Sequence, residues 1–210
     1  MKQSHFLSKA NVPILIISLF GIMFTTPASR EVTVALKSYV KIDGTSNVTN
    51  FSCKCGESYP KLKFSFDPTA KKGNNLFQGA LLKLKGEKLD CGNKLMNKDM
   101  YSTLNTTQYP YISLDVKEVS QADGLTIAHC TDWIPFEVKA VVTINGVSKS
   151  TVILLKGRNL GNSTFKFVGN WDFQLTDFNM TPPRRVMGMI KVGNEMRMNF
   201  DMEAQLLEPF

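Results

Sequence analysis

The residues of this chain whose types and spacing could do chemistry are Cys53, Cys55, Cys91, Cys130 and the neighbouring His129. Thiolates and an imidazole can bind zinc, and a thiol beside a base can act as a nucleophile. An even cysteine count in an exported protein instead favours disulfides, because the oxidising compartment competes for the thiolates. Cys53 and Cys55 would face the same side of a strand. We therefore expect each to pair with Cys91 or Cys130, and the connectivity stays open.

The sequence has no motif of a known catalytic device. It contains no Gly-rich phosphate loop, no nucleophile elbow and no His-rich metal motif. His129 is interpreted as a surface histidine near a disulfide, and the carboxylates fall mostly on polar strand faces. We therefore predict no catalytic residue, no metal site and no cofactor, and a protein that is not an enzyme. A thiol- or metal-dependent enzyme is the alternative.

The first 28 residues have the pattern of a signal peptide. Lys2 and Lys9 precede an apolar run over residues 12–24, and Ala28 follows as the last residue of a small-residue cleavage site. The run is shorter than the roughly 20 residues that a transmembrane helix needs. We expect a periplasmic or secreted protein without a stable transmembrane anchor, whose one folded domain covers residues 29–210. An uncleaved N-terminal anchor is the alternative.

The basic charge of the chain is mild and scattered. The formal net charge is +7, and it falls to +5 when Lys2 and Lys9 leave with the signal peptide. The two adjacent basic pairs, Lys71-Lys72 and Arg184-Arg185, are interpreted as solvated loop residues. There is no basic stripe of the kind that nucleic-acid binding needs, so nucleic acid is excluded as a partner. Weak attraction to an anionic membrane surface stays open.

The elements that would position these residues are mostly strands. Over residues 194–207 apolar and polar side chains alternate strictly, which predicts a strand with one apolar face. Similar alternation predicts a long first strand over residues 32–42 and further strands along the chain. Asn145-Gly146 is a strong hairpin signal, and Gly169 inside a strand predicts a bend. Residues 95–104 have helical spacing and predict a single short helix.

This pattern predicts an all-β fold, a single extended antiparallel barrel of about eight strands with one short helix. The inward face of a small barrel is filled by side chains or encloses one ligand. Periodicity assigns the best wall candidates to two apolar strand faces. They are Phe165, Phe167, Trp171, Phe173, Met198, Phe200 and Met202.

Several segments together resemble the YceI-like family of exported proteins. The first reads Gly-Thr-Ser-Asn-Val followed by Phe, and a later one gives Tyr-Pro-Tyr-Ile at a strand entry after the helix. A third reads Ile-Asn-Gly-Val-Ser-Lys in the hairpin. The matching segments are, in chain order, residues 44–51, 96–104, 109–112, 140–152, 173–178 and 192–196. Their order and spacing cover nearly all of the mature chain. The four cysteines and the length of residues 120–133 depart from the family pattern.

The resemblance implies a lipocalin-like barrel that holds a hydrophobic small molecule, an isoprenoid or fatty-acyl lipid, in an apolar tunnel. Together with the alternating faces, it makes an exported lipid-binding protein the leading hypothesis. The alternative is a non-catalytic structural or stress-related interaction protein with a filled barrel core. A homodimer through an outward strand face also stays open, because Val152 and Leu154 are apolar beside Ile153 and Leu155.

Overall fold

The computed structural model describes residues 29–34, 38–55, 62–66, 77–121 and 126–206 of the chain. The predicted signal peptide, residues 1–28, lies outside this part, as do residues 207–210. No helix among the described residues is long and apolar enough to cross a membrane.

The described chain is mostly strand. The strands are β1 (Ser29–Val34), β2 (Tyr39–Ser46), β3 (Asn50–Cys55), β4 (Leu62–Phe66), β5 (Phe77–Gln78), β6 (Ala80–Lys85), β7 (Tyr111–Gln121), β8 (Ile134–Ile144), β9 (Val147–Gly161), β10 (Thr164–Gln174), β11 (Arg184–Arg185) and β12 (Ile190–Leu206). The helical elements are α1 (Lys94–Thr103) and three short 3-10 turns, η1 (Gly86–Lys88), η2 (Ile127–His129) and η3 (Leu175–Phe178).

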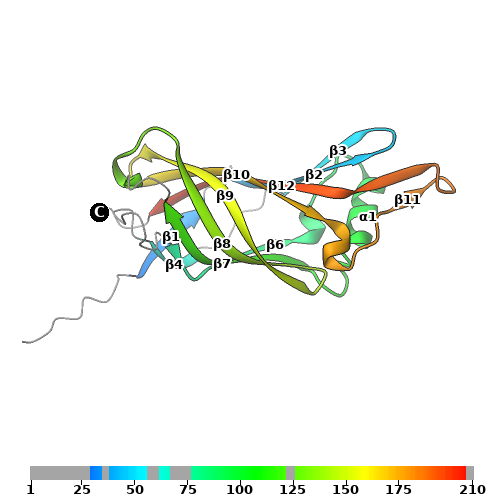
Figure 1. Ribbon diagram of the computed structural model, residues 1–210, viewed down its shortest axis with the longest axis horizontal. Coiled ribbons are helices and arrows are strands. Elements are labelled where there is room, and N and C mark those ends of the chain that lie inside the picture. Colours follow the sequence, from blue (N-terminus) through cyan, green and yellow to red (C-terminus); the bar gives the residue numbers. More distant parts are fainter. Residues whose placement is uncertain (1–28, 35–37, 56–61, 67–76, 122–125, 207–210) are drawn as a thin grey trace, which may run out of the picture.

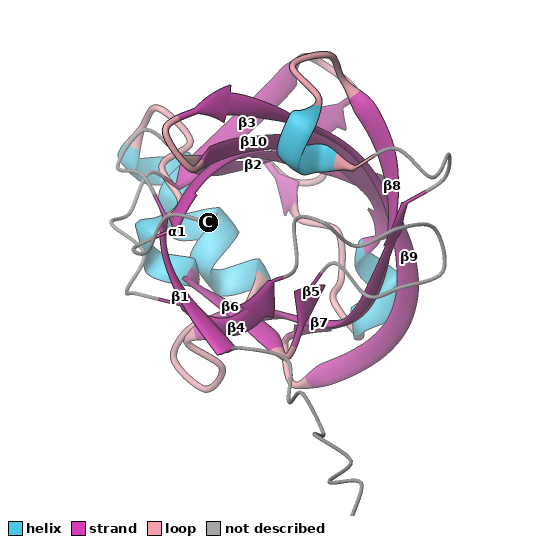
Figure 2. Cartoon of the chain, turned by 90° about the vertical axis from the view of Figure 1, so that its left-hand side faces the viewer, coloured by secondary structure: helices cyan, strands magenta, loops and turns pink. Residues whose placement is uncertain are grey.

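The strands form one antiparallel sheet that curls into an elongated barrel. Its main order is β5-β4-β1-β12-β10-β9-β8-β7-β6, and β2 and β3 continue from the other half of β12. Gly79 alone separates β5 from β6, so the two ends of this order meet. Figure 2 shows the resulting ring of strands seen end-on. The predicted all-β antiparallel barrel with one α-helix is therefore confirmed.

The long strand β12 runs the length of the barrel and supports both of its halves. It pairs with β10 along residues 195–205, and its other edge pairs with β2 and then with β1. The predicted alternation holds from Glu195 to Phe200, where Met196, Met198 and Phe200 are buried and Glu195 and Arg197 are exposed, but beyond it Glu203 is also buried. The expected single first strand is wrong: it is two strands, β1 and β2, which pair with different parts of β12.

The turns follow their sequence signals where glycine and asparagine are present. Asn145 and Gly146 both have positive φ values, 49° and 73°, and join β8 to β9 as predicted. Gly169 lets β10 approach β9 closely, because a Cβ there would lie 2.5 Å from the carbonyl oxygen of Leu154. The predicted bend at Gly169 stays a prediction, since the register shift of the β9–β10 ladder lies elsewhere, between Thr164 and Phe165.

The helix α1 covers one end of the barrel, beside β11 in Figure 1. The Asn93 side chain accepts a hydrogen bond from the backbone N–H of Met96, which caps the helix at its start. Leu104 ends it, close to the predicted boundary. None of the ten residues of α1 is fully buried. The helix therefore rests on the barrel end as a cover.

Candidate functional site

One apolar cavity in the described part of the chain is lined by strand residues alone, and we call it the strand-side cavity. Its volume is about 140 Å³, and β6, β7, β8, β9, β10 and β12 provide its walls. β12 contributes Phe200, Met202 and Ala204, and every other lining side chain is also apolar. A cavity without polar lining groups offers water no hydrogen-bond partners, so it favours an apolar occupant.

A second cavity of about 90 Å³ lies beneath α1, and we call it the helix-side cavity. Met96 and Met100 of α1 form its cover, and Phe51 of β3 and Phe173 of β10 contribute to its walls. Asp99 and Thr103 are its only polar lining residues within the described chain. Methionine side chains are flexible, so this cover can adapt to the shape of an apolar group.

One row of side chains lies between the two cavities, and we call it the partition. Met198 faces Trp171 in the β10–β12 ladder, between the Phe200 row of the larger cavity and the Met196 row of the smaller. Neither partition residue lines a cavity. The Trp171 indole N–H donates to Thr151 Oγ1 at 3.0 Å, and its ring stacks on Phe173 with centroids 4.9 Å apart. This anchoring fixes the indole against the neighbouring strand β9.

A disulfide attaches the segment that leads into α1. Cys53 of β3 is bonded to Cys91, and both residues line the helix-side cavity. Next to it, Lys54 and Asp90 exchange two backbone hydrogen bonds of 2.8 and 2.9 Å. On the far side of α1, the guanidinium of Arg185 binds both carboxylate oxygens of Asp99. These three links connect the cover to the barrel.

The other two cysteines are not joined to each other. Cys55 is buried beside Cys53 on the same face of β3, as predicted, and Cys130 follows η2. The Cys130 carbonyl accepts from the backbone N–H of Asn159 on β9, and β2, β12 and β10 lie between β3 and β9. A disulfide needs Cα atoms within about 7 Å. Of the two expected disulfides, one is therefore present, between Cys53 and Cys91.

Comparison with known proteins identifies the family. A family model described as the YceI-like domain matches residues 25–204. The chain belongs to the YceI-like family. No curated protein shows significant sequence similarity to it.

Solved structures of similar fold belong to bacterial proteins of low sequence identity. Burkholderia cenocepacia BcnA is 17% identical with a TM-score of 0.64, covering 81% of this chain and 98% of its own. A polyisoprenoid binding domain from Saccharophagus degradans, implicated in plant cell wall breakdown, is 11% identical with a TM-score of 0.62, covering 85% and 99%. The Campylobacter jejuni YCEI protein is 13% identical with a TM-score of 0.54, covering 99% and 100%. These likenesses show a shared fold.

The predicted wall residues all lie inside the YceI-like barrel, but they are divided among the two cavities, the partition and the packed core. Phe167, Phe200 and Met202 line the strand-side cavity, and Phe173 lines the helix-side cavity. Trp171 and Met198 form the partition. Phe165 is fully buried but lines neither cavity. Their role in binding stays a prediction.

Sequence reasoning missed most of the strand-side wall. The missed residues are smaller aliphatic side chains on β6 to β9, among them Ala80, Leu82, Leu114, Val138, Ile153 and Leu155. Their inward alternation could have been recognised, since β8 alternates buried and exposed residues from Ile134 to Ala140. Phe136 of β8 and Ala204 of β12 also line this cavity, so neither side-chain size nor the choice of strand separates lining residues from the rest of the core.

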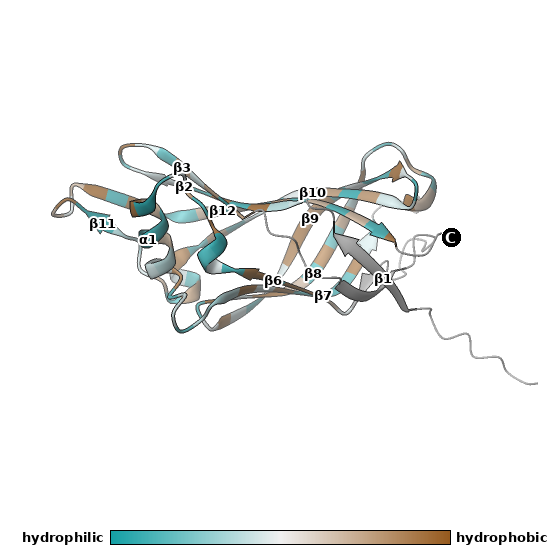
Figure 3. Ribbon diagram, turned by 180° about the vertical axis from the view of Figure 1, so that it is seen from behind, coloured by the Kyte–Doolittle hydropathy of each residue, from teal (hydrophilic) through white to brown (hydrophobic). Residues whose placement is uncertain are grey.

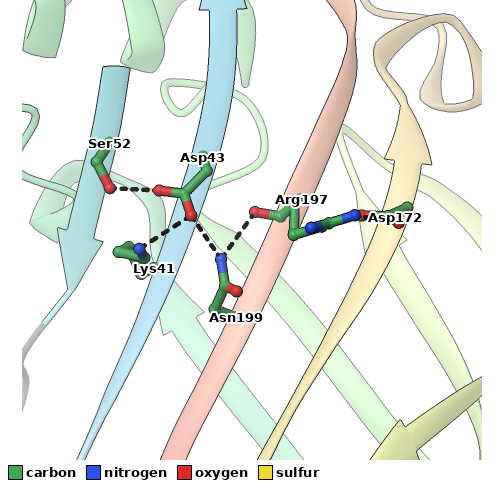
Figure 4. A network of polar contacts seen from close by, with 6 residues as sticks. All are labelled: Lys41, Asp43, Ser52, Asp172, Arg197 and Asn199. Carbon is green, nitrogen blue, oxygen red and sulfur yellow. Dashed lines mark hydrogen bonds and ion pairs between the residues drawn. The ribbon is translucent and has the colours of Figure 1, made fainter. Parts of the chain in front are cut away.

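A polar network covers the outer face of the barrel wall at the level of the partition (Figure 4). Asp43 on β2 accepts hydrogen bonds from Ser52, from Lys41 at 2.9 Å and from Asn199 at 2.8 Å. Burial raises the pKa of Asp43, but these hydrogen bonds outweigh it and hold the pKa below its ordinary value of 3.8.

The same outer face carries a second ion pair. Asp172 accepts hydrogen bonds from two nitrogens of Arg197, Nε at 2.6 Å and Nη2 at 2.9 Å, and this pairing lowers the pKa of Asp172. Each of the two carboxylates is satisfied by its neighbours. We interpret this face as a structural surface.

The alternative of a thiol- or metal-dependent centre has little support in the geometry. The sulfur of Cys53 is used in the disulfide, and His129 is exposed at the end of η2. No cluster of three or more metal-ligating side chains occurs in the described part of the chain.

Proposed function

We propose that this YceI-like protein is an exported binding protein that holds a long apolar lipid, with an isoprenoid-like or acyl chain, inside its barrel. The observation that carries the proposal is the strand-side cavity, whose lining side chains are all apolar. Each CH2 group that moves from water into such a space contributes about 0.8 kcal/mol. The description of the Saccharophagus degradans relative as a polyisoprenoid binding domain supports the same ligand class.

The size of the two cavities determines how a chain would fit. The strand-side cavity, at about 140 Å³, is close to the roughly 150 Å³ of an engineered cavity that binds benzene. A long chain therefore has to continue past the partition into the helix-side cavity. Met198, an unbranched side chain with several rotatable bonds, is the part of the partition that can move aside.

The second candidate function is a structural or stress-related interaction protein with a filled core. Phe136, Phe165 and Phe178 are almost completely buried and favour this alternative, because tight packing without a ligand is the usual state of a small barrel. The two functions differ in one measurable respect. A filled barrel takes up no hydrophobic probe. A lipid carrier binds a probe that fits its cavity, and it loses this binding when the cavity is filled.

Filling the strand-side cavity tests the proposal. Ala80 lines this cavity on β6, and its neighbour Leu81 is exposed on the opposite face of the strand. The variant Ala80→Phe should weaken binding of a fluorescent polyene fatty acid at least tenfold, because the ring occupies the space of the chain. The matched variant Leu81→Phe adds a ring on the same strand outside the barrel and should bind like the wild type.

The outcomes separate the two functions. Native mass spectrometry of protein purified without detergent, before and after incubation with isoprenoid quinones and fatty acids, gives the mass of any bound lipid. A wild-type protein that carries and takes up no lipid contradicts the proposal and favours the filled core. Equal binding by Ala80→Phe and Leu81→Phe places the fatty acid outside the strand-side cavity and also contradicts it.

Export is part of the proposal. The Cys53–Cys91 disulfide supports an oxidising compartment, the periplasm or the medium, because cytosolic thiols are kept reduced. Expression of the full chain with its own N-terminus should yield a soluble product that begins at Ser29. N-terminal sequencing of that product checks the cleavage, and a product that keeps residues 1–28 contradicts it.

A further inference from the structure

The hairpin that joins β11 to β12 ends in an exposed apolar tip, which we define as residues 184–191. Met187 is fully exposed, with a relative accessibility of 105%, and Val186 and Met189 are more than half exposed. Figure 3 shows this apolar turn at the outer end of the molecule, beyond α1. Large apolar side chains that extend into water contribute nothing to a core, so their position indicates contact with another surface.

The backbone conformation of the tip is unfavourable for two of these side chains. Val186 and Met187 both have a φ of 52°, in the left-handed region that glycine and asparagine favour. Two other hairpin turns have polar or glycine residues at their positive φ values, Asn145-Gly146 and Asn162-Ser163. A β-branched residue is a poor choice for this conformation in water. The tip therefore keeps apolar residues at the expense of local turn preference.

The base of the tip is positively charged. Arg184 lies directly opposite Lys191 in the β11–β12 ladder, and both are exposed. Neither has an ion-pair partner among the described residues, whereas Arg185 is neutralised by Asp99. Like charges that face each other across a ladder repel. An anionic surface in contact with the tip would relieve this repulsion.

A second hairpin supports the tip. The amide of Asn47, at the turn between β2 and β3, donates to the carbonyl of Met189 and accepts from the N–H of Lys191, each at 2.8 Å. The neighbouring Val48 is also exposed, with a relative accessibility of 62%. Two turns thus present apolar side chains together, above the helix-side cavity that Val192 and Pro183 help to line.

We propose that the tip docks this protein on the surface of an anionic lipid bilayer. Val186, Met187 and Met189 enter the interface between headgroups and acyl chains, and Arg184 and Lys191 contact the lipid phosphates. This combination of an apolar wedge and flanking basic residues is what interfacial binding requires. The inference goes beyond the proposed function and does not depend on whether the barrel holds a ligand.

Vesicle flotation tests the docking. Soluble protein obtained by expressing the full chain is mixed with vesicles of phosphatidylcholine, with and without phosphatidylglycerol. The wild type should bind the anionic vesicles and be released as the salt concentration rises. The double variant Met187→Ser with Met189→Ser should lose binding at least tenfold. The double variant Arg184→Gln with Lys191→Gln should bind both vesicle types equally weakly.

A matched control removes two exposed apolar residues elsewhere. Val152 and Leu154 lie on the outer face of β9, where they are 52% and 64% exposed. The double variant Val152→Ser with Leu154→Ser should float like the wild type. All variants share the same N-terminus, so differences among them report the tip. A tip variant that binds like the wild type, or a wild type that binds neither vesicle, overturns the proposal.

A fluorescence measurement gives an independent readout. In the variant Met187→Trp, the new indole should shift its emission to the blue when anionic vesicles are added. The wild type, with Trp133 and Trp171, supplies the background. An unshifted spectrum in the presence of bound protein means that the tip stays in water, and that result also overturns the docking.

Discussion

The two cavities of the barrel are closed by different means. The strand-side cavity is walled by β6 to β10 and β12, and ladders of backbone hydrogen bonds join these strands in the order β6-β7-β8-β9-β10-β12, with register shifts in the β7–β8 and β9–β10 pairs. The helix-side cavity is closed by α1, a helix without a fully buried residue. The disulfide, one isolated bridge and the Arg185–Asp99 pair attach that helix to the barrel.

These two kinds of closure differ in how easily the wall of the cavity can open. A ladder opens only when several adjacent hydrogen bonds break together, whereas a cover with few buried contacts can move in a local fluctuation. We infer that the strands set the shape of the larger cavity and that α1 controls access to the smaller. The first of the three predictions below tests this division directly, and the other two concern the tip and the acid response of the barrel wall, in order of decreasing effect.

The largest effect is expected from removing the disulfide. Cys53 and Cys91 are 38 residues apart, and cross-linking a loop of that length contributes about 4 kcal/mol to the free energy of unfolding by chain entropy. The double variant Cys53→Ser with Cys91→Ser should lose about that amount in denaturant titrations. Replacing both residues prevents Cys55 from taking over the pairing. Hydrogen exchange should increase more in α1 than in β8.

The control for this prediction is Cys130→Ser, which removes a thiol outside the disulfide. Its stability and its exchange rates in α1 should match those of the wild type. If the double variant raises exchange equally in α1 and β8, the helix is not a separately attached cover. In that case α1 and the barrel strands would open together, and the two cavities would not differ in how they are closed.

A smaller effect, of opposite sign, is expected at the tip. The double variant Val186→Asn with Met187→Gly gives the turn residues that favour positive φ, so it should stabilise the protein by about 1–2 kcal/mol. The melting temperature should rise while vesicle binding falls. Asn162→Gly, at an exposed turn position whose residue already favours a positive φ, is the control and should change stability little. A destabilised tip variant would mean that Val186 and Met187 make contacts that hold the turn.

The smallest effect is expected from acid. The pKa of Asp43 is held below 3.8 in the folded state, so its contribution to stability is present above that value and is lost as the pH falls below it. The melting temperature of Asp43→Asn should therefore depend less steeply on pH than that of the wild type between about pH 5 and pH 2. Because Ser52 of β3 binds Asp43, the acid effect should appear first at the helix end. Identical pH profiles of the two proteins would contradict this.

The strands were predicted best where alternation is strict. The face of β12 that carries Met196, Met198 and Phe200 could be assigned from spacing alone, because period two decides which side is buried. The helix and the Asn145-Gly146 turn were also predicted, since both depend on local signals. The resemblance of several spaced segments supplied the family.

Depth inside the barrel could not be predicted in this way. Alternation shows that Phe165 and Phe167 point inward, but only the packing of other strands decides that Phe167 alone lines a cavity. Trp171 belongs to the partition because Thr151, twenty residues away, accepts its N–H. The single disulfide likewise depends on which strands lie between β3 and β9. These are long-range consequences of the sheet order.

The partition gives the barrel a means of measuring its ligand. An occupant short enough to stay in the strand-side cavity leaves Trp171 bonded to Thr151, whereas a longer one must displace the Met198 side chain. Affinity across a homologous series of alcohols or acids should therefore rise with each added methylene until the chain reaches the partition. The next methylene should then add less affinity than the ones before it. The partition would thus distinguish short from long occupants by the free energy needed to move the Met198 side chain.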